Sequence, residues 1–198
     1  MKKIFKYISI ALTFIFFTFN LFASQNESLK IGSDEAKITV KVFSSLTCPH
    51  CATFHKNIFE KLKKEYIDKN KVKFEHHSFP LDLAALNAEK VLRCANSPEI
   101  SFNLLKEIYE KQDKWAIGSD INKINELLVK IGLDFGLSEN KIKNCLNNES
   151  VQEKILNERI EAQKKFKITS TPTIYLNEKK YEGKHEYELF KKQIEKLL

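Results

Sequence analysis

The sequence predicts an α/β domain that carries an inserted helical subdomain. Residues 37–80 show a strand–helix–strand pattern, and residues 82–165 show helical patterns with no strand among them. The closing segment, residues 166–198, places a short strand pair before a helix. With 198 residues, of which 42% are hydrophobic, the chain suits one domain with an insertion rather than two full domains.

The first 23 residues are expected to be a cleaved secretory signal. Three lysines precede an uncharged, mostly apolar stretch over residues 7–22, and Ala23 is followed by polar residues. This three-part pattern predicts export, with cleavage after about Ala23. The alternative is an uncleaved membrane anchor, although the stretch is shorter than the roughly 20 residues that a span requires. Residues 24–36 are polar and are expected to form a leader arm.

The first part of the α/β domain is expected over residues 37–81. Ile38, Val40 and Val42 alternate with other residues, which predicts a strand. Apolar positions at helical spacing predict a helix from about residue 48 to 66, and a second alternation predicts a strand ending near Pro80. Two strands joined by a helix normally run parallel with a right-handed crossover.

The segment 82–165 is too long for a single crossover helix, so it is expected to be an inserted helical subdomain. Pro98 suits the first turn of its helix, Ser119 is the expected N-cap of the third helix, and Gly132 is expected just past that helix's end. The expected helices cover residues 82–95, 98–113, 119–131, 138–146 and 149–165.

The chain is expected to return to the α/β domain over residues 166–198. Residues 173–176 form a short apolar run that predicts a strand, with a partner strand over 179–181. Residues 185–198 place apolar side chains on one helical face, which predicts the last helix.

The charge of the chain argues against a nucleic-acid partner. The net charge of +7 falls to +4 without the three lysines of the signal, and only Arg93 and Arg159 among the 33 basic residues are arginine. The lysines are scattered among acidic residues, whereas nucleic-acid sites favour clustered cations and arginine. We therefore expect no nucleic-acid binding.

The chemistry is expected at Cys48-Pro49-His50-Cys51, at the start of the first helix. A helix N-terminus offers unpaired backbone N–H groups and the positive end of the helix dipole. Both favour a thiolate at Cys48 and lower its pKa from about 8.5 to the range of roughly 3.5–7.5. His50 adds a donor or partial positive charge, and Pro49 is tolerated in a first turn. A stabilised thiolate makes the oxidised pair a good disulfide donor.

Two other roles for this pair remain open. Zinc binding is one, but it would need two more ligands, and Cys94 and Cys145 are far apart in the sequence. A purely structural disulfide is the other, but it would close too small a ring to stabilise the chain much. Thiol–disulfide exchange without metal or cofactor is the preferred hypothesis, and a non-enzymatic zinc- or protein-binding module is the alternative from another class.

A second signature is Thr171-Pro172-Thr173, where a proline precedes an apolar strand. Together with the segments Ser44–Cys51 and His77–Leu81, it resembles the DsbA-type thiol–disulfide oxidoreductases of the thioredoxin-like superfamily. The resemblance extends over nearly the whole mature chain and includes the helical insertion. It implies a thioredoxin-like fold in which Pro172 is cis and lies against the two cysteines. Thr171 would offer backbone groups to an extended substrate peptide.

The resemblance also implies partners and a compartment. The substrates would be folding exported proteins with free thiols, and a DsbB-like membrane partner would reoxidise the Cys48–Cys51 pair. The protein would work in the periplasm and is expected to be a monomer. The short segment 24–36 leaves no room for the dimerisation domain of isomerases, which favours an oxidase.

The sequence departs from the family pattern in two places. Val42 stands six residues before Cys48, where many relatives carry a buried acid that relays protons. Thr171, before the proline, also occurs in reductases and isomerases, so either of these activities remains the alternative.

The other two cysteines, Cys94 and Cys145, lie on expected helices of the insertion. We expect a structural disulfide between them that closes a loop of about 50 residues, worth roughly 4 kcal/mol in the entropy model. A second redox pair and two buried free thiols are the alternatives. His76 and His77 alternate faces of a strand, so they are not expected to share one site.

Overall fold

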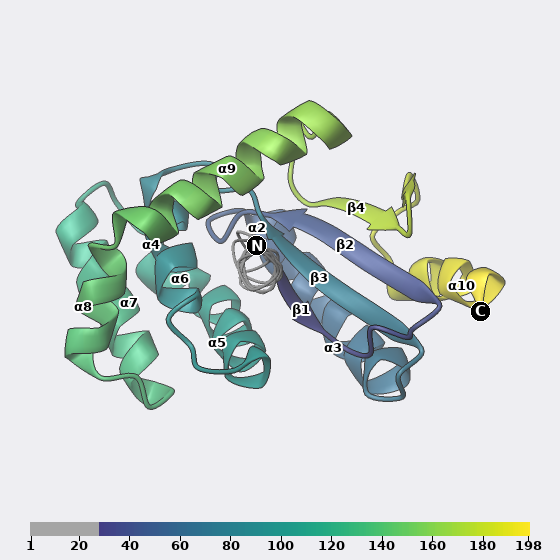
Figure 1. The fold of residues 1–198 in the computed structure, drawn as a ribbon, viewed down its shortest axis with the longest axis horizontal. Helices are drawn as coiled ribbons and strands as arrows, with labels where there is room; N and C mark the ends of the chain where they lie inside the picture. Colours follow the sequence, from purple (N-terminus) through teal and green to yellow (C-terminus); the bar gives the residue numbers. More distant parts are fainter. Residues whose placement is uncertain (1–27) are drawn as a thin grey trace, which may run out of the picture.

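A mixed five-stranded sheet lies at the centre of the computed structural model, which describes residues 28–198. The predicted signal, residues 1–23, lies outside the described residues. The strands run in the order β1-β3-β2-β4-β5, with β2 and β3 parallel and the other pairs antiparallel (Figure 1). Their bounds are Leu29–Ile31 (β1), Ile38–Ser44 (β2), Val72–Ser78 (β3), Thr173–Leu176 (β4) and Lys179–Lys180 (β5).

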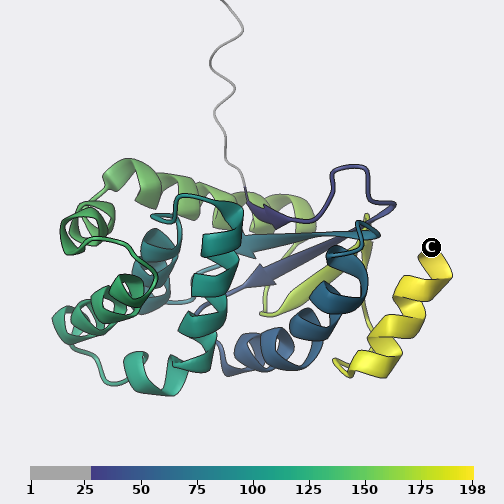
Figure 2. The same ribbon diagram turned by 90° about the horizontal axis from the view of Figure 1, so that it is seen from below.

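Helices cover both faces of this sheet. One continuous helix from Pro49 to Ile67, here called the active-site helix, joins β2 to β3 and lies on one face with α10 (Tyr187–Leu197) (Figure 2). It alternates between α-helical and π-helical turns: α2 (Pro49–Phe54), η1 (His55–Phe59), α3 (Glu60–Leu62) and η2 (Lys63–Ile67). The opposite face lies under α9 (Glu149–Phe166) (Figure 2).

The pleat of the strands explains this layering. Val42 and Ile174 point to the main core beneath the active-site helix. Phe43, the neighbour of Val42, points the other way and packs with Phe79 and Ala162 under α9. Successive side chains of a strand face opposite sides, so a sheet buried on both faces needs apolar residues at consecutive positions.

The insertion is entirely helical in the structure and shares its core with the sheet. The main cluster of buried side chains includes Val42 from the sheet and Leu104, Trp115 and Leu128 from the insertion. Trp115 is fully buried, and its indole N–H donates to the carbonyl of Ile108 at 2.7 Å. The helices besides α9 are α4 (Leu83–Leu92), α5 (Pro98–Glu110), α6 (Gln112–Trp115), α7 (Ile121–Asp134) and α8 (Glu139–Leu146).

The expectation of a leader arm over residues 24–36 is wrong for Leu29–Ile31, which form β1 on the outer edge of β3. Three residues are too few for an alternation to stand out in the sequence. The strand is half-buried, and Leu29 and Ile31 pack against the main core.

Two expected ends of the third insertion helix, α7, also differ from the structure. Asp120, rather than Ser119, caps the helix, because its carboxylate accepts from the backbone N–H groups of Asn122 and Lys123. Gly132 lies inside the helix instead of past its end. A Cβ at Gly132 would come within 2.7 Å of the Ile142 side chain, so the glycine allows α8 to pack closely against α7. The expected helix over 98–113 is split into α5 and α6.

Buried polar contacts connect the sheet to the insertion. His76 Nε2 lies 2.8 Å from Glu89 Oε1 on α4, and the Ser78 hydroxyl donates to Glu89 Oε2 at 2.9 Å. On the other face of β3, His77 contacts Glu75 at 3.1 Å and Glu158 on α9 at 3.3 Å. The prediction that the two histidines point to opposite faces is confirmed.

A disulfide joins Cys94, just after α4, to Cys145 in α8, with a Cα–Cα distance of 6.1 Å.

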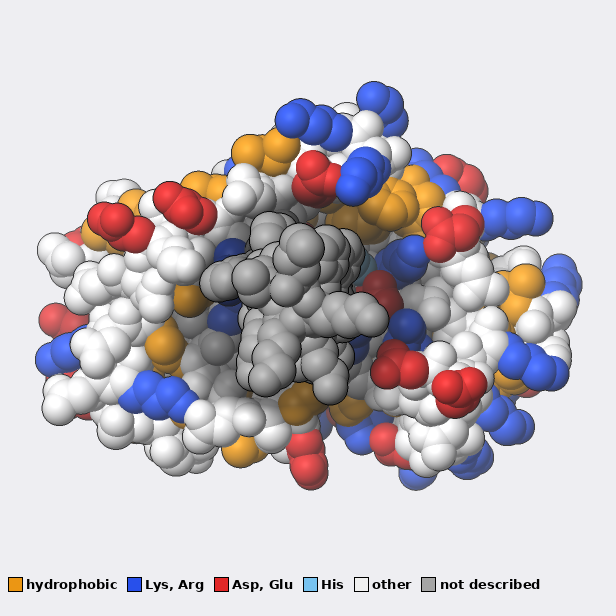
Figure 3. All heavy atoms as spheres, in the orientation of Figure 1, with side chains coloured by type: hydrophobic (Ala, Val, Ile, Leu, Met, Phe, Trp, Pro, Cys, Tyr) orange, Lys and Arg blue, Asp and Glu red, His pale blue; other side chains and the backbone are white. Residues whose placement is uncertain are grey.

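Figure 3 shows cationic and acidic side chains interspersed over the described part of the visible face, without a stripe of one sign. Among residues 28–198, no helix combines the length and the apolar composition that a membrane span needs.

We predict that Glu89→Ala destabilises the folded protein by about 3 kcal/mol, because it leaves buried His76 and Ser78 without their shared acceptor. Urea unfolding of the purified protein measures this loss. Glu126→Ala, on the exposed side of α7, is the matched control and should change stability by less than about 0.5 kcal/mol. A loss below about 1 kcal/mol for Glu89→Ala would contradict the structural role of these buried contacts.

Candidate active site

The pairing of β2 with β4 brings the two sequence signatures together. Phe43 pairs with Thr173 in an antiparallel register, so the last residues of β2 lie beside the first residues of β4. The chain leaves β2 directly into the loop before Cys48, and Pro172 directly precedes β4. Segments more than 120 residues apart in the sequence therefore meet, and Cys48 Sγ lies 3.4 Å from the carbonyl oxygen of Thr171.

Cys48 occupies the N-cap of the active-site helix, with extended backbone angles of φ −81° and ψ 118°. Pro49 stands in the first turn, where its missing N–H group costs no helical hydrogen bond. Pro49 and His50 are exposed, whereas Cys48 retains only 7% of its surface. The Thr171–Pro172 peptide is cis, and both residues are half-buried.

The surroundings of Cys48 favour its thiolate. A hydrogen bond from the Cys51 thiol is the main cause that lowers the pKa of Cys48, from an ordinary 9.0 to about 5. Burial opposes this effect, while the Thr171 side chain and the backbone N–H groups of Cys51 and His50 lower the pKa further. The free N–H groups of the first helical turn thus stabilise the negative sulfur.

Cys51 has the opposite environment. It points into the core and retains 1% of its surface. Burial raises the pKa of the Cys51 thiol far above its usual value, and the hydrogen bond and charge of Cys48 raise it further. When the pair is reduced, Cys48 is therefore the thiolate and Cys51 the protonated thiol.

Side chains from the insertion hold the loop that carries Cys48. The Gln112 amide on α6 donates to the carbonyls of Leu46, at 2.8 Å, and Cys48, at 3.2 Å. The Thr47 hydroxyl donates to Asp82 Oδ2, at the start of α4, at 2.7 Å. The sequence indicates Asp82 only as the beginning of a helix, and no local signal points to Gln112.

The remaining sequence candidates lie apart from this site. Cys94 and Cys145 are bound to each other, so they are not two further thiolate ligands beside Cys48 and Cys51. Within residues 28–198, no three side chains of His, Cys, Asp or Glu are arranged to hold a metal ion. His185, by contrast, lies near the site without any signal for it in the sequence. Burial lowers the pKa of His185, and the nearby charge of His50 lowers it further.

Comparison with known proteins agrees with this geometry. The family model described as thioredoxin matches residues 24–196. Disulfide bond formation protein D of Bacillus subtilis is 31% identical over 177 residues, which cover 85% of this chain and 76% of that protein. A Rickettsia typhi protein provisionally named a protein-disulfide oxidoreductase is 33% identical over 156 residues, or 79% of this chain. The match spans only 57% of that longer protein.

Solved structures give the same result at the level of the fold. The crystal structure of alpha-DsbA1 from Wolbachia pipientis superimposes with a TM-score of 0.79 and 31% identity, covering 86% of this chain and 90% of the other. Oxidised BdbD from Bacillus subtilis gives a TM-score of 0.72 and 28% identity, covering 86% and 92%.

We predict that Cys51→Ala raises the pKa of Cys48, because it removes the hydrogen bond that contributes most to lowering it. Ultraviolet absorbance of the thiolate, followed against pH, should give a midpoint near pH 5 for the reduced wild type and a clearly higher one for Cys51→Ala. The reciprocal variant, Cys48→Ala, should show no thiolate through the neutral range. Equal midpoints in the wild type and Cys51→Ala would contradict this account.

Proposed function

Since this chain belongs to the thioredoxin-like family of DsbA-type thiol–disulfide oxidoreductases, we propose that it is a dithiol oxidase that donates the Cys48–Cys51 disulfide to exported proteins. The observation that carries the proposal is the position of the pair: Cys48 lies at the helix N-cap and Cys51 is buried in the core, which lowers the pKa of Cys48 and raises that of Cys51. A stabilised Cys48 thiolate makes the reduced pair stable and the oxidised pair a strong acceptor of electrons.

The proposed reaction consists of two exchanges. A substrate thiolate attacks Cys48 Sγ, the Cys48–Cys51 bond breaks, and Cys51 leaves with the electron pair and takes up a proton. A second thiolate of the substrate then attacks the substrate sulfur of this mixed disulfide, and Cys48 leaves as a thiolate. The substrate gains one disulfide and loses two electrons, which the cysteine pair holds. The low pKa of Cys48 favours the second exchange because it makes Cys48 a good leaving group.

We propose that the substrate binds as an extended segment beside Thr171 and cis Pro172. Support comes from the position of both residues at the start of β4, where backbone groups can pair with an added strand. The exposure of Pro49 and His50 leaves the Cys48 side of the helix open to a large partner. The substrates would be folding proteins with free thiols.

Turnover requires that the reduced pair is oxidised again. We propose a DsbB-like membrane partner for this step, and the periplasm as the compartment, on the basis of the signal-like residues 1–23. In this reaction scheme the protein acts as a monomer with one cysteine pair.

We predict that the oxidised protein restores disulfides to a reduced, unfolded substrate protein, and that Cys48→Ser abolishes the transfer. Mass spectrometry of trapped substrate counts the disulfides formed. The double variant Cys94→Ser/Cys145→Ser is the matched control, because it removes two sulfurs outside the site and should retain transfer by the wild-type chemistry. Transfer by Cys48→Ser, or none by the folded wild type, would refute the proposed function.

The direction of electron flow gives a separate prediction. The lowered pKa of Cys48 stabilises the reduced folded state relative to the unfolded one, where the pKa is ordinary. This contribution is complete above about pH 9, shrinks as the pH falls, and is absent below about pH 5. Urea unfolding should therefore find the advantage of the reduced over the oxidised protein larger at pH 8 than at pH 5. A more stable oxidised form at pH 8 would favour the reductase or isomerase alternative.

A further inference from the structure

The Cys51 sulfur must exchange a proton in every turnover, although it is almost completely buried. It retains 1% of its surface and faces the core. When its bond to Cys48 breaks, the sulfur becomes an anion in an apolar environment, which is costly until a proton arrives. The underlying strand supplies no acid here, because Val42 is an apolar side chain. A route for the proton must therefore come from another element.

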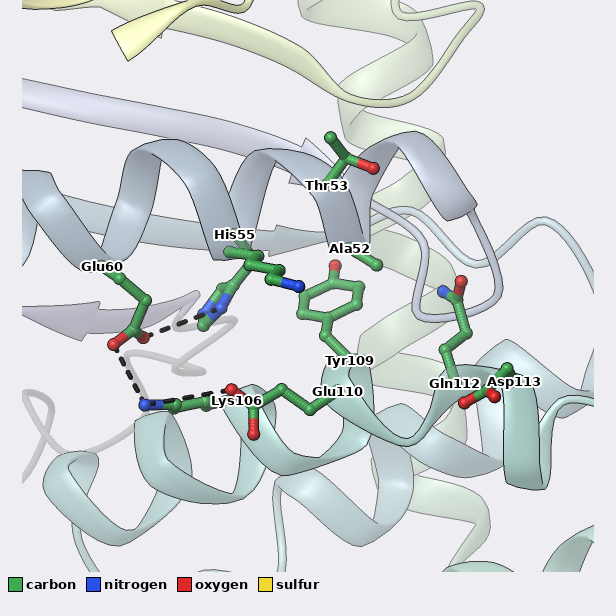
Figure 4. Close-up of a pocket in the computed structure, with 10 residues that line it drawn as sticks. Ala52, Thr53, His55, Glu60, Lys106, Tyr109, Glu110, Gln112 and Asp113 are labelled. Carbon is green, nitrogen blue, oxygen red and sulfur yellow. Dashed lines mark hydrogen bonds and ion pairs between the residues drawn. The ribbon is translucent and has the colours of Figure 1, made fainter.

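Tyr109, on α5, reaches this region from the insertion. Its ring points from α5 towards the first turn of the active-site helix, below Ala52, the neighbour of Cys51 (Figure 4). The residue retains 6% of its surface, and its hydroxyl makes no well-formed hydrogen bond to a described residue; the polar side chain that faces it is Ser44. Burial raises the pKa of Tyr109 well above its usual value, and the charges of Cys51 and Glu89 raise it further, while Ser44 lowers it. The hydroxyl is therefore protonated at neutral pH and can give its proton only to a strong base such as the buried Cys51 anion.

His55 lies one helical turn after Cys51, on the same face of the active-site helix. Its ring centroid is 5.2 Å from that of Tyr109. His55 retains 4% of its surface, and its Nε2 has no hydrogen-bond partner among the described residues. Burial, with His76 and Lys106 nearby, lowers the pKa of His55 to about 3. The ring is therefore neutral, with one nitrogen that donates and one that accepts.

A cavity of about 500 Å³ connects these two side chains to the surface. It lies between the active-site helix and the α5–α6 segment, and both His55 and Tyr109 line it (Figure 4). His55 Nδ1 is 3.9 Å from Glu60 Oε1, and Glu60 Oε2 accepts from Lys106 at 3.2 Å. The charged side chains around the cavity are Lys56, Glu60, Lys106, Glu110 and Asp113.

We propose that Tyr109 and His55 carry the proton between this cavity and the Cys51 sulfur. As the Cys48–Cys51 bond breaks, the Tyr109 hydroxyl gives its proton to the Cys51 anion and regains one from the His55 side of the cavity. When the pair is oxidised again, the same proton leaves in reverse. The electron pair of the attacking thiolate forms the new bond to Cys48, and the pair of the broken Cys48–Cys51 bond stays on Cys51, so the relay moves protons only. The inference rests on the proposed function for its biological use, but not for its chemistry.

The other buried titratable pair near Tyr109 is less suited to this role. His76 and Glu89 face each other at 2.8 Å, and the second oxygen of Glu89 accepts from Ser78. Their hydrogen bonds are thus already made inside the core, away from the cavity lining. Their position instead contributes to keeping Tyr109 protonated and His55 neutral.

The test is the reduction of the oxidised protein by dithiothreitol, which needs no protein substrate. Samples are quenched in acid, alkylated and counted by mass spectrometry. We expect dithiothreitol to reduce the Cys48–Cys51 disulfide of Tyr109→Phe at least about 10-fold more slowly than that of the wild type at neutral pH, because a positioned proton donor is lost. The slow reaction should accelerate with the concentration of buffer acid and show a larger solvent deuterium isotope effect than the wild type. His55→Gln should show the same buffer dependence and serves as the second variant if Tyr109→Phe does not fold.

Tyr187→Phe is the matched control, because Tyr187 is also buried, at 7% exposure, but does not line the cavity. It should be reduced at the wild-type rate. A wild-type rate in folded Tyr109→Phe would overturn the relay, and so would a slower rate without buffer or isotope dependence, since that would indicate disturbed packing. The separate assay of transfer to a substrate protein decides the proposed function, so the two can fail independently.

Discussion

The antiparallel register between β2 and β4 is the constraint on which the site depends. It sets Phe43 opposite Thr173, and thereby places the loop before Cys48 beside Thr171 and Pro172. A slip of one residue would exchange the two faces of a strand, moving Val42 and Phe43 to the wrong sides of a sheet that is buried on both. The packing of two separate cores therefore fixes the position of the reactive sulfur.

The parts of this arrangement that local sequence can specify were predictable. The alternation in β2, the helical spacing after Cys48 and the cysteine pair at a helix start each depend on neighbours in the chain, and the fold class follows from them. β1 was missed because three residues carry too little pattern. Gly132 was misplaced because its role, a close approach to Ile142, depends on a helix packed against it and not on the end of its own helix.

The support of the site could not be predicted for a related reason. Gln112 and Asp82 hold the Cys48 loop from α6 and from the start of α4, through contacts that span 35 to 66 residues. Nothing in the sequence around Gln112 distinguishes it from other polar residues on a helix. The insertion therefore completes the site, and it does so from within the same core as the sheet.

The two sulfurs need opposite environments, and the first turn of one helix provides both. At the N-cap, Cys48 meets free backbone N–H groups and the open side of the molecule, so its anion is stabilised. Three residues later the helix has turned, and Cys51 faces the core, where its anion is disfavoured. In the proposed reaction this asymmetry makes the Cys48 sulfur the attacked atom and the leaving group, but it also separates Cys51 from solvent. The burial that disfavours the Cys51 anion therefore makes a proton route necessary in the proposed reaction. On the side of the cavity, the next turn of the helix supplies His55 and α5 supplies Tyr109.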